Sequence, residues 1–199
     1  MARLNADGSL DNTFVVNKGF YTGSVYALAA LPNGKVMAGG DFNTYNGIAC
    51  HNLIRLNNDG TMDNSFTVPG KPTKEYSGYG IFTLVIQKDG KILAGGKFDY
   101  YNTKLQQSIV RLNTDGSIDN TFGGETGFDT EGRGGALVSA ITLTIEGNIV
   151  AGGSYKRYDA ELRSNIAEMD KNGKLLQNLF HAMMNFNKTD NLFVLQTTK

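Results

Sequence analysis

The sequence predicts an all-β protein, built as a β-propeller-like array of four-stranded antiparallel blades. Two observations lead to this prediction. Similar phrases recur along the chain at a regular spacing, and short apolar runs alternate with turn residues. A regular period of this kind is typical of stacked or radial units. Four short strands in each repeat match the size of a propeller blade.

The recurring phrase appears three times in nearly the same form and once in a weaker form. Its copies read RLNADGSLDNTF at 3–14, RLNNDGTMDNSF at 55–66, RLNTDGSIDNTF at 111–122 and EMDKNGKLLQNLF at 168–180. A second phrase, Ala-Gly-Gly, falls at 38–40, 94–96 and 151–153, with spacings of 56 and 57 residues. The two phrases alternate at similar spacings, so the chain is built from copies of one unit.

The stretches of one copy can be assigned in order. VYALAAL at 25–31 is a buried strand, and PNG at 32–34 supplies the left-handed backbone of a hairpin turn. KVMAGGDF at 35–42 is the second strand, whose paired glycines leave room for a neighbouring backbone or a bend. NLIRLN at 52–57 is the third strand. After the NDG turn, MDNSF at 62–66 leads into a short fourth strand.

The repeat sets the domain organisation. We expect blades at about 25–66, 81–122 and 138–180, with terminal pieces at 1–14 and 181–199. The first piece starts at a third strand, and the last contains NLFVLQTTK, which looks like a first strand. Three outcomes stay open: the chain is cut from a longer protein, the two pieces meet in a small fourth blade, or copies assemble so that their ends complete one another.

The phrases LPNGKVMAGG, QKDGKILAGG and RLNxDGSxDxxF resemble the delta-60 repeat, a β-propeller-type repeat of bacterial surface, secreted and phage-associated proteins. The resemblance covers almost the whole chain. It implies a propeller, and it implies little about biochemical role. The fourth copy departs from the pattern, because Glu168, Met169 and Asp170 replace Arg, Leu and Asn.

Composition argues against several classes of function. Lys+Arg and Asp+Glu both number 19 and no segment is strongly basic, which disfavours nucleic-acid binding. The apolar runs are shorter than the roughly 20 residues of a membrane-spanning helix, so no membrane insertion is expected. No signal peptide is visible at the N-terminus. Cys50 is the one cysteine, which leaves neither an intramolecular disulfide nor a cysteine zinc site.

The NxDGSxD loops place oxygen-bearing side chains at alternate positions, which is one pattern of a calcium site. The candidate metal ligands are Asp7, Asp11, Asp59, Asp63, Asp115 and Asp119. In the structural alternative, Asp-Gly forms a turn and the second acid of each loop caps backbone amides. The fourth copy keeps the turn and loses the acids, which favours turn geometry. We expect no cofactor, and Ca²⁺ is the one candidate that the loops offer.

An arginine stands in an apolar strand in three of the copies, as Arg3, Arg55 and Arg111. A buried guanidinium needs a partner. Each arginine could bind a ligand carboxylate, or it could pair with an aspartate of its own or a neighbouring blade. The second interpretation is favoured, since Glu168 occupies the equivalent place in the fourth copy.

The stretch after each Ala-Gly-Gly carries a tyrosine followed by an amide or an acid. These candidate ligand-binding residues are Tyr45, Asn46, Tyr101, Asn102, Tyr158 and Asp159. An aromatic ring can cover the apolar face of a sugar while the neighbouring amide bonds its hydroxyls. In the alternative, which we favour, the rings pack the blade edge and their polar neighbours form a turn.

We predict a non-enzymatic structural and binding module that presents loops to a glycan or protein partner on a cell surface or virion. The alternative is a bacteriophage tail, fibre or other virion component that acts by self-assembly. Its partner would be itself or a neighbouring subunit, through an incomplete terminal blade. A propeller-fold glycosidase or lyase is a weaker third candidate, and its acids would be Glu125, Asp129 and Glu131. HExxH, phosphate-loop and nucleophile-elbow motifs do not occur in the sequence.

Overall fold

A computed structural model describes residues 1–15, 17–67, 72–73, 79–101, 104–123, 126–131 and 135–177. All regular secondary structure within these ranges is β-strand, and every named strand pair is antiparallel. The described residues contain no helix of the length and hydropathy needed to cross a membrane. The all-β prediction is confirmed.

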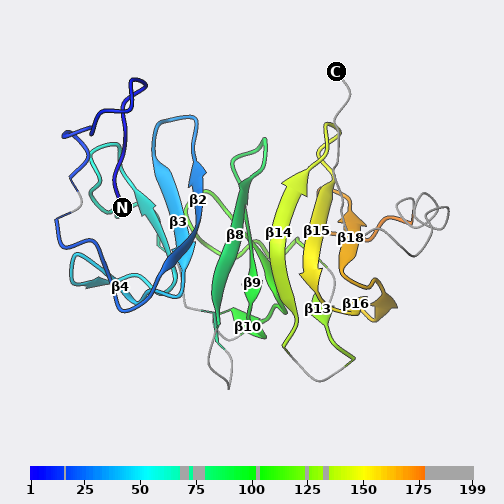
Figure 1. The fold of residues 1–199 in the computed structure, drawn as a ribbon. Coiled ribbons are helices and arrows are strands. Elements are labelled where there is room, and N and C mark those ends of the chain that lie inside the picture. Colours follow the sequence, from blue (N-terminus) through cyan, green and yellow to red (C-terminus); the bar gives the residue numbers. More distant parts are fainter. Residues whose placement is uncertain are drawn as a thin grey trace.

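Three similar sheets, here called blades, follow one another along the chain (Figure 1). In each blade the second strand lies between the first and the third. Blade 1 contains β2 (Val25–Ala30), β3 (Val36–Gly40) and β6 (Leu53–Leu56); blade 2 contains β8 (Gly80–Ile86), β9 (Ile92–Lys97) and β12 (Ile109–Leu112); blade 3 contains β14 (Leu137–Leu143), β15 (Ile149–Ser154) and β18 (Ile166–Met169).

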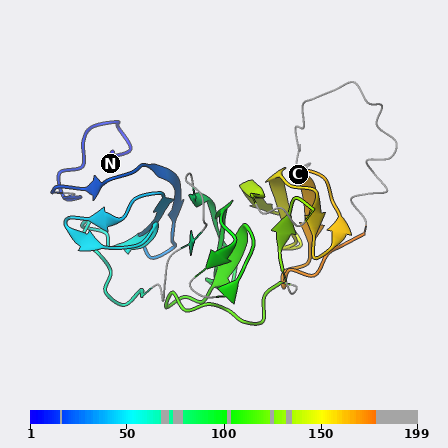
Figure 2. The same cartoon turned by 90° about the horizontal axis from the view of Figure 1, so that it is seen from below.

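The blades are arranged as neighbouring blades of a propeller. Strand β8 contacts both β2 and β14, so the first strands form a row across the molecule (Figure 1). Seen along the strands, the three blades lie on an arc (Figure 2). The apolar core is divided in the same way. One cluster lies between blades 1 and 2, another between blades 2 and 3, and a third joins Phe14 to blade 1.

A second set of three small sheets lies at one end of the blades, at the bottom of Figure 1. We call this end the small-sheet rim. The central strand of each small sheet directly follows an Ala-Gly-Gly strand. The small sheets are β1 (Phe20–Tyr21), β4 (Thr44–Tyr45) and β5 (Ile48–Ala49); β7 (Pro72–Thr73), β10 (Tyr100–Tyr101) and β11 (Lys104–Leu105); and β13 (Phe128–Asp129), β16 (Arg157–Tyr158) and β17 (Glu161–Leu162).

The blades have three strands each, whereas the sequence predicted four. The expected fourth strand is reduced to one bridge in each copy, namely Leu4↔Leu10, Leu56↔Met62, Leu112↔Ile118 and Met169↔Leu175. The aspartate that follows the bridge explains why the fourth strand is so short. The carboxylate of Asp63 accepts hydrogen bonds from the amide and hydroxyl of Ser65. This local turn takes the amide that a longer ladder would use, so the chain leaves the sheet.

The paired glycines serve contact between blades as well as local backbone geometry. A Cβ atom built on Gly39 would lie 2.6 Å from the side chain of Ile81 in blade 2. A Cβ atom on Gly95 would lie 2.7 Å from the side chain of Val138 in blade 3. In blades 1 and 2 the first glycine of the pair therefore makes room for a side chain of the next blade.

Candidate functional site

The three predicted glycan-stacking tyrosines lie in the core. Tyr45, Tyr101 and Tyr158 are at most 1% exposed. The hydroxyl of Tyr45 donates to the carbonyl of Gly60 at 2.6 Å, and the hydroxyl of Tyr158 donates to the carbonyl of Gly173 at 2.5 Å. Burial raises the pKa of Tyr101 far above its ordinary value. The rings are closed to a ligand, which corrects the stacking interpretation in favour of its packing alternative.

The polar neighbours of these tyrosines form turns. Asn46 and Asp159 both have positive φ, 51° and 48°. The side-chain oxygen of Asn46 accepts the amide of Gly19 at 2.8 Å, and that of Asp159 accepts the amide of Gly127 at 2.9 Å. Each therefore attaches the segment before its blade to the small sheet. Asn102, the third predicted residue of this kind, lies outside the described residues.

The first aspartate of each NxDG loop stabilises its own turn. One carboxylate oxygen of Asp115 accepts the amide of Ser117 at 2.9 Å and its hydroxyl at 2.7 Å. Asp7 and Asp59 make the same pair of bonds to the residue two positions later. These hydrogen bonds lower the pKa of all three carboxyls. The arrangement is an Asx turn, as the structural alternative predicted.

The second aspartate of each loop pairs with the arginine of its own copy. The Nε atoms of Arg3, Arg55 and Arg111 lie 2.7, 2.6 and 2.8 Å from Oδ2 of Asp11, Asp63 and Asp119. The guanidinium groups also cover the rings of Phe14, Phe66 and Phe122 at 4.7–4.8 Å. The pairing favoured from sequence is therefore present in all three copies.

Two lysines that sequence reasoning missed complete these pairs. Lys35 and Lys91 place their ammonium groups 2.7 and 2.8 Å from Oδ2 of Asp63 and Asp119. Burial tends to raise the pKa of each carboxyl, but the hydrogen bonds and positive charges around it outweigh burial and hold the pKa well below its usual range. The signal was present in the sequence, because a lysine follows the hairpin glycine in both copies.

The six aspartates do not gather into a metal site. Within the part of the chain that the structure describes, no three acidic, histidine or cysteine side chains stand close enough together to hold an ion. The oxygens proposed as calcium ligands instead accept hydrogen bonds from serine, threonine and arginine of the same phrase, and Asp63 and Asp119 also from a lysine of the preceding hairpin. The carboxylate oxygens of each loop thus bind groups of the protein itself, chiefly the local backbone and the arginine.

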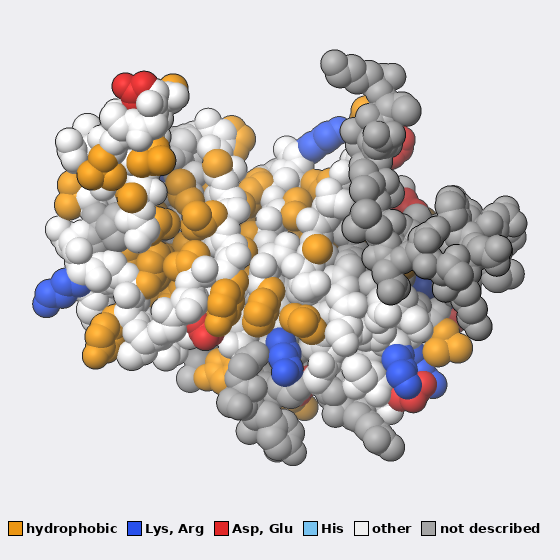
Figure 3. All heavy atoms as spheres, in the orientation of Figure 1, with side chains coloured by type: hydrophobic (Ala, Val, Ile, Leu, Met, Phe, Trp, Pro, Cys, Tyr) orange, Lys and Arg blue, Asp and Glu red, His pale blue; other side chains and the backbone are white. Residues whose placement is uncertain are grey.

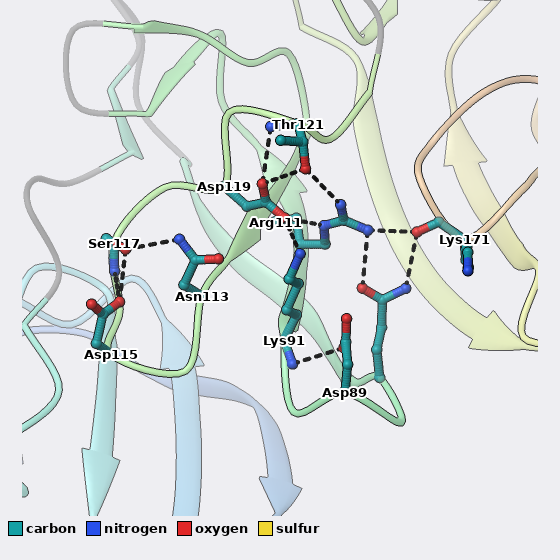
Figure 4. A network of polar contacts seen from close by, with 10 residues as sticks. Asp89, Lys91, Arg111, Asn113, Asp115, Ser117, Asp119, Thr121 and Lys171 are labelled. Atoms are coloured by element: carbon teal, nitrogen blue, oxygen red, sulfur yellow. Dashed lines mark hydrogen bonds and ion pairs between the residues drawn. The ribbon is translucent and has the colours of Figure 1, made fainter.

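The arginine also reaches the next blade, which the sequence did not reveal. Nη1 of Arg55 donates to the carbonyl of Thr114 at 2.6 Å, and Nη1 of Arg111 donates to the carbonyl of Lys171 at 2.5 Å (Figure 4). Both acceptors occupy the same position in the glycine turn of the following copy. Gln87 donates to the Lys171 carbonyl as well, at 3.2 Å.

A backbone contact beside each arginine joins its copy of the phrase to the next copy. The amides of Val15, Thr67 and Gly123, which follow the phenylalanine of each phrase, donate to turn carbonyls of the next copy at 2.8–2.9 Å. The turn glycine is in close contact at this point, since a Cβ atom on Gly116 would lie 2.8 Å from the Thr67 carbonyl oxygen. We call this arrangement of arginine, phenylalanine and glycine turn the blade junction.

Blade 3 keeps the backbone of the phrase but lacks its ion pair. Glu168 stands in place of the arginine, and Leu176 stands in place of the aspartate. The amide of Leu176 still donates to the carbonyl of Glu168 at 2.8 Å, as the equivalent residues do in blade 2. The carboxylate of Glu168 accepts a hydrogen bond from Asn148 instead, at 3.1 Å. Both members of the pair have changed together, so blade 3 keeps neither an arginine nor an aspartate of the pair without its partner.

Two other places contain groups that could take part in chemistry. Cys50 is buried, and burial raises the pKa of its thiol to about 11, which disfavours a thiolate nucleophile. A cleft of about 340 Å³ lies between blades 2 and 3. Lys88, Asp89 and Glu146 line it, and the Arg111 junction forms its wall. The cleft mixes both signs of charge, and the guanidinium in its wall is already bonded to protein groups.

The comparisons with known proteins agree with this geometry. The family model described as a domain of unknown function (DUF5122) beta-propeller matches residues 1–14, 31–66 and 87–122. The chain is a propeller-type repeat protein. The matched stretches contain three copies of the repeated phrase and two of the Ala-Gly-Gly strands with the turns that precede them. A search of curated proteins found no match. The matched stretches thus contain the arginine, aspartate and phenylalanine of the first three phrases, and the description of the family names no chemistry.

Proposed function

We propose that this propeller scaffold is a non-enzymatic binding module that holds a glycan or protein partner on its small-sheet rim. The supporting observation is a contrast between neighbouring positions. The buried tyrosine is the same in all three blades, whereas the residues beside it differ from blade to blade and are exposed or half-buried. The varying sets are Thr44, Tyr100 and Arg157, and Ile48, Lys104 and Glu161.

The rim also exposes apolar side chains that the blades do not need for packing. Tyr21, Ile48, Tyr100 and Leu162 are exposed large hydrophobic residues, and all four belong to the small sheets. Aromatic and aliphatic residues on such a surface are typical of recognition sites, because partners bury them. The repeated polar residues are occupied within the junctions, so the rim is the surface that supports recognition best.

The acids proposed for a glycosidase do not favour catalysis. Asp129 accepts the amide of Glu131 at 2.6 Å, and Glu131 lies 3.2 Å from the ammonium group of Lys156 on the surface. Glu125 lies outside the described residues. An exposed acid that pairs with a lysine, as Glu131 does, lacks the enclosed setting in which a carboxyl becomes a general acid at neutral pH.

We also propose that the repeat is of the delta-60 type and that a cell surface or a virion is its location. The phrases LPNGKVMAGG and QKDGKILAGG support the repeat name, since they contain the turn, the strand and the paired glycines of one unit. The location follows from the repeat type alone. Assembly into a larger particle is the second candidate function, and the exposed Leu4 and Leu28 at the blade 1 end favour it.

Incubation with a panel of bacterial polysaccharides and surface proteins tests the binding proposal. We expect retention of a partner that Tyr100→Ala and Ile48→Asp reduce and that the distant substitution Glu146→Gln leaves unchanged. Reducing ends should not increase during the incubation. New reducing ends would contradict the non-enzymatic proposal, and binding that ignores both rim substitutions would contradict the choice of the rim.

A further inference from the structure

The cleft between blades 2 and 3 is built by three turns. Residues 87–90 form the β8–β9 turn, residues 144–147 form the β14–β15 turn, and residues 170–173 form the glycine turn of the blade 3 phrase. The volume of about 340 Å³ lies at the lower end of the range for small-molecule sites, about 300–1,000 Å³. Lys88 joins two of the turns, since its ammonium group donates to the carbonyl of Ile145 at 3.4 Å.

Besides the arginine of the junction, four charged side chains line the cleft, two of each sign. They are Lys88, Asp89, Glu146 and Lys171. Figure 3 shows basic, acidic and hydrophobic side chains close together at the top of the molecule, where the β14–β15 hairpin turns. Within the ranges that the structure describes, none of the four takes part in an ion pair, whereas the charged residues of the junctions do. The cleft thus offers opposite charges that the protein itself does not pair.

The repeat shows that the junction does not require these charges. Between blades 1 and 2, Arg55 donates to a carbonyl of the next glycine turn just as Arg111 does between blades 2 and 3. Three of the four charges have uncharged counterparts there, namely Pro32, Asn33 and Thr114 in place of Lys88, Asp89 and Lys171. Because the same contact forms without them, the charges are additions to the cleft rather than parts of the junction.

The wall of the cleft is fixed by hydrogen bonds and includes an apolar side chain. Gln87, which stands in place of Leu31, donates to the carbonyl of Lys171 at 3.2 Å and accepts from Nη1 of Arg111 at 3.4 Å. Gln87 is 8% exposed, so this part of the wall is held in place. The half-buried Leu143 also lines the cleft and offers an apolar contact.

The charged groups keep atoms that are not used for local structure. Figure 4 shows one carboxylate oxygen of Asp89 accepting the amide of Lys91, at 3.1 Å. Lys171 enters the junction through its carbonyl oxygen, so its ammonium group is not used there. A hydrogen bond from the side chain of Thr144 lowers the pKa of Glu146, which is therefore ionised at neutral pH.

We propose that this cleft binds a small zwitterion, namely a short peptide with free ends and an apolar side chain. Its ammonium group binds Asp89 and Glu146. Its carboxylate binds Lys88 and Lys171, and its side chain contacts Leu143. A ligand with one sign of charge would meet two like charges, which disfavours it. The cleft lies at the end of the blades opposite the small-sheet rim (Figure 1), so this inference does not depend on the proposed function of the rim.

Isothermal titration calorimetry of the full chain with three peptides tests the ligand class. The probes are leucyl-leucine, N-acetyl-leucyl-leucine, which lacks the ammonium group, and leucyl-leucinamide, which lacks the carboxylate. Leucyl-leucine should bind saturably. Either cap should weaken binding about fivefold or more, because it removes the interaction with one pair of charges. Equal binding of a capped peptide would overturn the proposal, since the cleft would then recognise one sign of charge only.

Substitutions in the cleft test its location. Lys171→Gln and Glu146→Gln should each weaken the binding of leucyl-leucine about fivefold, and both residues are exposed, so the fold should be kept. Lys174→Gln is the matched control, since Lys174 is exposed next to the same turn and does not line the cleft. Tyr100→Ala on the rim should have no effect, which separates this test from that of the rim. No binding at millimolar peptide, or an equal loss in Lys174→Gln and Lys171→Gln, would overturn the proposal.

Discussion

The phrases at 111–122 and 3–14 have almost the same sequence and different surroundings. Both form the same turn. The backbone amide of Asn113 donates to the carbonyl of Ser117, and that of Asn5 donates to the carbonyl of Ser9, each at 2.8 Å. Both pair arginine with aspartate. The copy at 111–122 is buried between blades, whereas the copy at 3–14 stands at the end. The phrase therefore folds locally, and its burial depends on the neighbouring blades.

The largest difference should appear when the arginine is removed. Arg111 is 2% exposed and bridges to Lys171, so Arg111→Met should lower the free energy of unfolding by about 3–5 kcal/mol. Arg3 is 33% exposed, and within the described residues it bonds only to its own phrase, so Arg3→Met should cost about 0–1 kcal/mol. Urea unfolding measures both. Equal losses would remove the distinction between interior and end.

The turn glycines offer a smaller and equally matched contrast. Gly8 and Gly116 have φ of 84° and 93°, so alanine at either position costs about 1–2 kcal/mol in backbone strain. A Cβ atom on Gly8 meets nothing within 4 Å, whereas one on Gly116 would lie 2.8 Å from the Thr67 carbonyl oxygen. Gly116→Ala should therefore lower the urea midpoint further than Gly8→Ala. The reverse order would show that the junction does not close tightly on the turn.

Acid should separate the two copies further. Hydrogen bonds from Thr13 and then Arg3 lower the pKa of Asp11 to about 2. The carboxyl of Asp119 is held lower still, against burial, chiefly by Lys91 and Thr121. Because the folded pKa lies below the unfolded value of 3.8, each carboxylate stabilises the fold above pH 4 and loses that effect as pH falls. Thermal melts between pH 6 and 2 measure how far the melting temperature falls with pH. Asp119→Asn should reduce this pH dependence more than Asp11→Asn.

The smallest expected effect is that of calcium. One carboxylate oxygen of Asp7 and one of Asp115 already accept hydrogen bonds from the residue two positions later. The oxygens of Asp119 accept hydrogen bonds from Thr121, Arg111 and Lys91. Millimolar Ca²⁺ should leave the melting temperature unchanged, relative to the same protein in a chelator. A clear rise that Asp115→Asn abolishes would restore the metal interpretation of the loops.

The sequence was sufficient for the repeat, the strand order and the pairing of arginine with aspartate. Period and turn residues specify these features locally, and the loss of both Arg and Asp in the fourth copy was already visible. The fourth strand was predicted wrongly, because pattern alone does not show that Asp63 bonds Ser65 and turns the chain aside. The contact from Arg55 to Thr114 was missed, since it joins residues 59 positions apart.

The tyrosines show a second limit of pattern reasoning. Repetition of Tyr45, Tyr101 and Tyr158 is compatible with a repeated site and with a repeated core position. Burial decides between them, and burial depends on how the small sheets fold back over the blades. Rim residues such as Tyr100 and Ile48 differ from blade to blade. A search for repeated residues therefore does not find them, although this variation is what makes them candidates for recognition.

The most direct test of the junction is hydrogen exchange at the two crossing amides, Thr67 and Gly123. Each donates to the turn of the next blade, at 2.9 and 2.8 Å. Both amides should be protected in the unaltered protein, and Arg111→Met should lower the protection of Gly123 more than that of Thr67. Rapid exchange of both amides in the unaltered protein, or an equal loss at both in the variant, would contradict the claim that the repeated phrase joins one blade to the next.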